Sequence, residues 1–166
     1  MTEATEVVLR VSGGYLTLYD RALREHAVVT ALPARGGAVT AGASELQLHV
    51  HAELVPLRLC IRAGAADEVR DCSDPEPSFA DADGEDLSTV LETTLELPTG
   101  QLLLATSAGA QLSLNDFSAP TGTCHVRVRT RGGPAAGRIE DAYLDADSDE
   151  LIEQVGPEEW VVYLYR

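Results

Sequence analysis

Two histidines stand one residue apart in His49-Val50-His51, within an expected strand over residues 45–54. In a strand, residues i and i+2 share a face and lie about 7 Å apart, close enough for two imidazoles to bind one metal ion. Glu53 or His125 would have to complete such a divalent-metal site. The alternative is that both histidines occupy the polar face of an exposed strand. The spacing therefore allows a metal site without requiring one.

A second candidate site is the basic stretch CHVRVRTRGG at residues 124–133. In an extended strand, one face of this stretch carries three arginines: Arg127, Arg129 and Arg131. A row of guanidinium groups can clamp a phosphate or a carboxylate, because each presents paired N–H donors. The same row can pair with acidic residues of a neighbouring strand, such as Glu92, Glu96 or Glu53. Because the chain is so rich in carboxylates, we favour cross-strand pairing over an anion site.

Aspartate-rich stretches also suggest binding of a divalent cation. The stretch DADSDELIEQVG, residues 145–156, has aspartates at the first, third and fifth positions of a calcium loop. It has Glu150 where the tight turn needs glycine, and Gly156 where the loop needs a bidentate glutamate. The stretch FADADGED, residues 79–86, lacks the first aspartate. A helix cap and a solvated loop explain these residues as well, so the pattern indicates at most weak binding.

No pattern for catalysis is present. The sequence lacks Gly-x-Ser-x-Gly, a phosphate-binding loop, and Gly-x-Gly-x-x-Gly after an expected strand. Pairs of serine and aspartate are frequent, but an acid-rich chain produces them by chance. We therefore expect a non-enzymatic protein that needs no cofactor.

The negative charge is concentrated in two segments. The formal net charge is −15, and residues 67–86 and 140–159 contain nine acidic residues each, against Arg70 as their only base. Such segments repel nucleic-acid phosphates and attract cations or a basic protein surface. We therefore expect a partner to bind these carboxylates: Asp71, Asp74, Glu76, Asp81, Asp83, Asp86, Asp145, Asp147, Asp149 and Glu150. The alternative is halophilic adaptation, which would spread carboxylates over the whole surface.

Length and composition predict a single cytoplasmic domain over residues 1–166. No apolar run is long enough to span a membrane, and the acidic start does not resemble a secretory leader. The three cysteines fit no metal or redox spacing, so we expect reduced, packed thiols. Lysine is absent and Ala, Gly, Val and Arg are abundant, a composition typical of high-GC bacterial or halophilic sources.

The elements that must position these residues are short strands. Period-2 alternation predicts about ten of them, which indicates an antiparallel sandwich or a partly closed barrel. Residues 6–11 and 15–20 flank Ser12-Gly13-Gly14 and read as a hairpin. One short helix is expected near residues 148–155, where Asp147 and Glu150 form a capping box and Gly156 ends it. The other expected strands are residues 26–33, 45–54, 57–62, 89–98, 123–131, 137–145 and 160–166, with a further hairpin over 100–116.

The last third of the chain resembles a bacterial family. CHVRVRTRGG, EDAYLD and WVVYLYR, within residues 101–166, resemble the small β proteins of the competence protein J type, whose named member inhibits a nuclease. This resemblance implies a non-enzymatic inhibitor or immunity-type protein that binds a basic nuclease or toxin. His49-x-His51 resembles the first cupin motif, which implies a small-molecule or metal-binding β-barrel as the alternative. The cupin pattern is incomplete, because Glu53 follows too early and Leu103 occupies the position of the later histidine.

Overall fold

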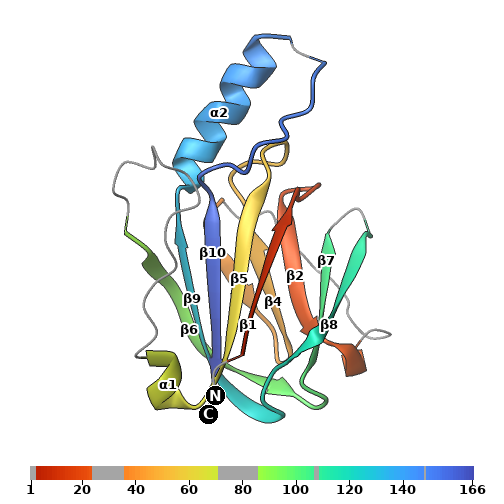
Figure 1. Cartoon of the computed structure of the whole chain (residues 1–166), viewed down its shortest axis with the longest axis vertical. Coiled ribbons are helices and arrows are strands. Elements are labelled where there is room, and N and C mark those ends of the chain that lie inside the picture. The colour runs from red at the N-terminus through yellow and green to blue at the C-terminus, as the bar shows by residue number, and fades with distance from the viewer. Residues whose placement is uncertain (1–2, 24–35, 71–85, 107–108, 148) are drawn as a thin grey trace.

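The computed structural model describes residues 3–23, 36–70, 86–106, 109–147 and 149–166, and it shows a sandwich of two five-stranded sheets (Figure 1). In spatial order, the first sheet contains β1 (Glu3–Leu9), β5 (Leu57–Gly64), β10 (Glu159–Tyr165), β9 (Gly122–Arg131) and β6 (Ser88–Leu97). The second contains β3 (Val39–Ala41), β4 (Glu45–His49), β2 (Tyr15–Asp20), β7 (Gln101–Thr106) and β8 (Gln111–Ser118). The all-β sandwich predicted from the sequence is confirmed.

The core between the sheets is mainly aliphatic. Strand β6 shows how alternation produces it, because Leu95 and Leu97 are buried whereas Glu92 and Glu96 face solvent. Trp160 is fully buried in the same cluster. The expected packed thiols are confirmed at two described positions, Cys60 and Cys124, which are buried and free. The third cysteine, at position 72, lies outside the described residues.

Strand β10 is the centre of the first sheet. It pairs in parallel with β5, whereas the seven other strand pairs described are antiparallel. All its residues are buried, and its run of apolar side chains is typical of a strand covered on both faces. Its first residue, Glu159, lies opposite Arg58 of β5 and Arg131 of β9. The topology thus brings a carboxylate between two arginines at the end of the sheet.

The predicted hairpin over residues 6–11 and 15–20 is wrong. Strand β1 pairs with β5 in the first sheet, and β2 pairs with β4 and β7 in the second. The intervening turn, with Gly13 at φ 84° and Gly14 at φ 81°, crosses from one sheet to the other. Alternation shows which side chains face the core but not which strand lies alongside, so it did not reveal the crossing. The predicted strand at residues 26–33 lies outside the described residues.

The helix position was also predicted wrongly. Helix α2 (Gly133–Asp145) covers residues predicted as a strand, and residues 149–155 are not helical. Pro134 in the first turn favours the helix, and Ala136 and Ile139, three residues apart, pack on one face. The expected cap Asp147 has φ 49°, a left-handed conformation beyond the C-terminus of α2. A further helix there would bury little, since Leu151 is 70% exposed. Two short helical turns complete the described fold: η1 (Arg21–Leu23) and α1 (Ala66–Arg70).

Helix α2 rises from one end of the sandwich, and both chain termini lie at the opposite end (Figure 1). Among the described residues, no helix has both the length and the apolar character that crossing a membrane would require. The end that carries α2 also holds the polar residues discussed next.

Candidate functional site

The second half of α2 and the segment after it form an acidic arm. We define the acidic arm as residues 141–147 and 149–153. It contains no arginine, lysine or histidine. Six carboxylates of the arm are exposed: Asp141, Asp145, Asp147, Asp149, Glu150 and Glu153. Four of them belong to the predicted partner-binding set, so the structure leaves these four accessible to a partner.

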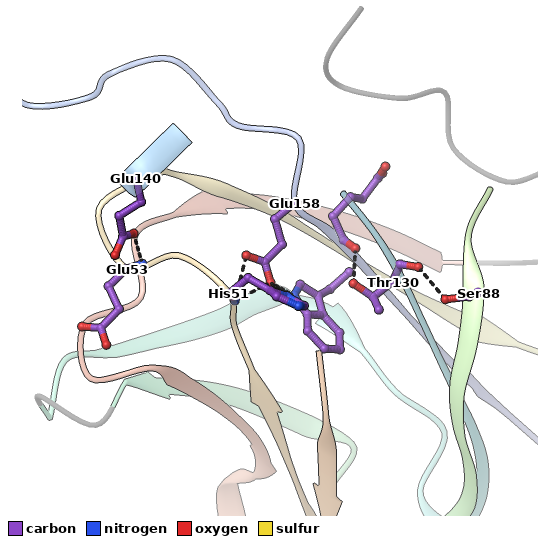
Figure 2. Close-up of polar contacts among 8 residues, drawn as sticks. His51, Glu53, Ser88, Thr130, Glu140 and Glu158 are labelled. Atoms are coloured by element: carbon purple, nitrogen blue, oxygen red, sulfur yellow. Dashed lines mark hydrogen bonds and ion pairs between the residues drawn. The ribbon is translucent and has the colours of Figure 1, made fainter. Parts of the chain in front are cut away.

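The base of α2 is fixed to the sandwich. Ala136 is buried in a small cluster with Ala52 and Val55. The Glu140 carboxylate accepts hydrogen bonds from the backbone N–H groups of Glu53 at 2.5 Å and Leu54 at 2.9 Å. Figure 2 shows this contact beside the polar residues at the end of the sheets. Glu140, predicted only as part of an acidic segment, is therefore an anchor of the helix.

His51 and Glu158 form a second anchor at the foot of α2 (Figure 2). The buried Glu158 carboxylate accepts hydrogen bonds from the His51 backbone N–H, at 3.1 Å for each oxygen, and from Trp160 Nε1 at 3.0 Å. His51 Nδ1 lies 3.6 Å from Glu158 Oε1. A Cβ added at Gly133 would lie 2.0 Å from His51 Nδ1, so the imidazole is packed directly against the start of the helix.

The two histidines predicted as a metal pair have different environments. Strand β4 ends at His49, so the alternation expected through residue 54 stops before His51. His49 is buried, with its ring centroid 6.0 Å from that of Tyr15 and Nε2 at 3.4 Å from Thr40 Oγ1. The exposed strand face expected for His49 is therefore wrong, because both faces of β4 are covered.

The proposed additional metal ligands also have other partners. Glu53 accepts a hydrogen bond from the Gly13 backbone N–H at 2.9 Å, and the His125 ring stacks on Tyr165 at 5.6 Å. Within the described ranges, no three or more His, Cys, Asp or Glu side chains form a group that could hold a metal ion. Metal binding by His49 and His51 stays a prediction.

His49 should make stability depend on pH. Burial lowers the pKa of His49 below its ordinary value of 6.5, because the charged form loses hydration. The unfolded chain then binds a proton more readily than the folded one, so stability should fall as pH drops through 6.5. Urea unfolding at several pH values between neutral pH and about pH 5 measures the slope of the free energy of unfolding against pH. The His49→Gln variant should have a shallower slope, whereas His125→Gln, altered at an exposed ring, should keep it; equal slopes in all three proteins would contradict the prediction.

The arginine row is engaged within the protein. Arg127 Nε pairs with Glu92 Oε1 across β9 and β6 at 3.0 Å, which confirms the expected cross-strand pairing for that residue. Arg129 donates to the Leu87 carbonyl at 2.5 Å, and Arg131 Nε donates to Glu159 Oε2 at 2.6 Å. Anion binding by the three arginines stays a prediction.

Glu96, another acid of the predicted pairing, and Glu159, which was not part of it, have different roles. Glu96 accepts a hydrogen bond from Thr123 Oγ1 rather than from an arginine. Glu159 also pairs with Arg58 and is fully buried, as Glu158 almost completely is. The contact face predicted over residues 140–159 therefore loses its last two carboxylates. Their position directly before the apolar stretch WVVYLY is the sequence signal that could have shown this.

A cavity of about 300 Å³ lies beside the foot of α2. Ser88 Oγ donates to the Thr130 carbonyl at 3.2 Å on its wall. Asp86 lines this cavity together with the first residues of α2. It is the one member of the predicted partner-binding set from the first acidic segment that lies within the described residues. The other predicted members there lie outside the described residues: Asp71, Asp74, Glu76, Asp81 and Asp83. The lining residues are His51, Asp86, Ser88, Thr130, Arg131, Gly132, Gly133 and Pro134.

These features define a class of protein: a two-sheet β-sandwich that carries an acidic helical arm at one end. Two solved structures share the fold over nearly the whole chain. ComJ from Bacillus subtilis, an inhibitor of the DNA-degrading activity of NucA, matches with a TM-score of 0.55 at 9% identity, covering 99% of this chain and 98% of ComJ. The protein of crocagin biosynthetic gene J matches with a TM-score of 0.50 at 13% identity, covering 100% and 99%.

The likeness noted in the last third of the sequence is confirmed as a likeness of fold, and it extends through both sheets. No protein-family model matches the sequence, and no curated protein matches it. At these identities the comparison establishes the architecture alone.

Proposed function

We propose that this chain is a non-enzymatic binding protein that docks on a basic protein, of the nuclease or toxin class, and restrains it. The observation that carries the proposal is the acidic arm, whose six carboxylates are exposed and whose sequence contains no basic residue. The shared fold with ComJ, itself an inhibitor of a nuclease, supports an inhibitory role. Exposed carboxylates can occupy the surface on which a nuclease binds phosphates.

Electrostatics would make this association fast and sensitive to salt. Opposite charges accelerate the encounter of two proteins. Added ions weaken this attraction, because at moderate ionic strength charges more than about 10 Å apart are largely screened from each other. DNA itself is repelled by the same carboxylates. This chain would thus compete with nucleic acid for the partner without itself binding nucleic acid.

A pulldown from the source cell tests the proposal. The full chain as bait should retain a basic protein at low salt and release it at high salt, and the captured protein should degrade DNA or act as a toxin until the chain is added back. Asp145→Asn/Asp149→Asn should weaken capture. Asp116→Asn/Glu92→Gln, with the same change in net charge, should not. Recovery of no basic protein under either wash, or folding that requires molar salt, would count against the proposal.

A second candidate function, small-molecule or metal binding, is favoured by one observation: the cavity is lined by His51. Elemental analysis of the untagged protein, with His49→Ala/His51→Ala as control, tests the metal form of this alternative. A stoichiometric transition metal lost in the variant would support it.

A further inference from the structure

Only the first half of α2 is supported by the sandwich. The buried residues of the helix are Gly133 and Ala136, both in its first turn, and the last side-chain anchor is Glu140. From Asp141 to Leu151, every described residue is exposed except Tyr143, which is half-buried. A single helical segment has little stability in water without packing, so a helix end of this kind gains most from a partner.

The arm also carries apolar side chains where solvation alone would favour polar ones. Leu144 is 58% exposed and Leu151 is 70% exposed, the two largest exposed fractions among the large apolar side chains of the described residues. Single exposed leucines are common on protein surfaces. Here both lie within one short arm, and acidic residues precede and follow each of them in the sequence. These leucines were not among the predicted site residues, although two leucines within an acidic segment are visible in the sequence.

This arrangement matches the anatomy of a protein interface. Interfaces combine a few apolar anchors, which become fully buried, with a polar rim that excludes water and sets specificity. Adaptation to solubility or to high salt explains the carboxylates but not the exposed leucines. A calcium loop does not explain the leucines either, because calcium ligands are oxygen atoms.

We infer that the acidic arm inserts into its partner, with Leu144 and Leu151 seated in an apolar depression bordered by arginine and lysine side chains. This inference rests on the proposed function and names the part of the surface that makes the contact. Charge complementarity selects the occupant, because an arm with six carboxylates and no basic residue disfavours an acidic surface, a nucleic acid or a second copy of this chain. The carboxylates govern mainly the rate of association, and the leucines govern mainly the rate of dissociation.

Site-specific photo-crosslinking in the source cell tests the inference even while the partner is unidentified. p-Benzoylphenylalanine is introduced into the full chain at Leu144 or Leu151, and at the exposed control positions Leu112 of β8 or Val90 of β6. Circular dichroism confirms that each variant is folded. We expect both arm positions to form an adduct with the same basic protein, sensitive to salt, and the control positions to form none.

Each other result overturns the inference, and the pattern shows whether the proposed function fails with it. Adducts with a basic protein at Leu112 or Val90 alone would move the contact elsewhere and leave the proposed function standing. An adduct with a second copy, or with a protein that is not basic, would exclude the occupant inferred here. No adduct at any of the four positions would remove both claims.

Association and dissociation rates of the captured complex distinguish the role of the leucines from that of the carboxylates. Leu144→Ala and Leu151→Ala should each raise the dissociation rate about tenfold or more, with little change in the association rate. Leu112→Ala should leave both rates unchanged. Equal rates in the arm variants and the control would overturn the role of the leucines even if the carboxylates contribute.

Discussion

Replacing Glu159 by glutamine is expected to lower the free energy of unfolding by about 3–5 kcal/mol. Glu159 is fully buried, and its carboxylate pairs with Arg58 on one side and Arg131 on the other. Arg131 is also almost completely buried. Without the carboxylate, this guanidinium keeps its desolvation cost and loses its counter-charge, which is the expensive way to break a buried ion pair.

Glu92→Gln is the matched control for this prediction. It removes a carboxylate that pairs with the same arginine-bearing strand, but the Glu92–Arg127 pair is exposed, so the expected cost is only about 0–1 kcal/mol. Urea or guanidinium unfolding of both variants beside the parent measures the difference. Similar losses in the two variants would mean that burial does not distinguish these ion pairs.

The second large effect is expected at Gly132, the residue that joins β9 to α2. Its φ is +72°, and an added Cβ would lie 1.9 Å from the Pro157 carbonyl oxygen. Gly132→Ala should therefore combine left-handed strain with a backbone clash, for a total of about 2–5 kcal/mol. The variant should also shift the base of α2, because the clash can be relieved only by moving one of the two backbones.

Gly109 offers a control of the same conformation. Its φ is +84°, but an added Cβ would meet no atom of the described residues within 4 Å. Gly109→Ala should therefore cost only the left-handed strain, about 1–2 kcal/mol. Denaturant unfolding compares the two, and nuclear magnetic resonance shifts of Ala136 and Ile139 report whether α2 moves. A Gly132 variant no less stable than the Gly109 variant would show that the junction is loosely packed.

Both predictions concern the part of the sandwich on which α2 rests. Glu159 pairs with Arg131 at the end of β9, directly before α2 begins, and Gly132 sets the direction in which the helix leaves the sheet. If the arm is the docking element, either variant should weaken partner binding through the position of α2. Variants of the exposed carboxylates should weaken binding at unchanged stability, which separates the two causes.

The sequence alone determined the class of fold and the positions of most strands. Alternation in residues 15–20 and 89–98 identified β2 and β6 as strands, because a period of two follows directly from strand geometry. The sequence also showed that acidic residues are concentrated in the last part of the chain, and the structure places six of these carboxylates on the exposed arm. These features depend on neighbours along the chain, so local patterns carry them.

Only the tertiary structure decided which strands pair, where the helix lies and which charges are buried. Residues 137–145 can form a strand or a helix by pattern, and the choice followed from the packing of Ala136 against distant Ala52 and Val55. Glu159 resembled its acidic neighbours until β10 placed it between arginines far away in sequence. Burial and pairing depend on contacts between distant segments, and a one-dimensional pattern contains no term for them.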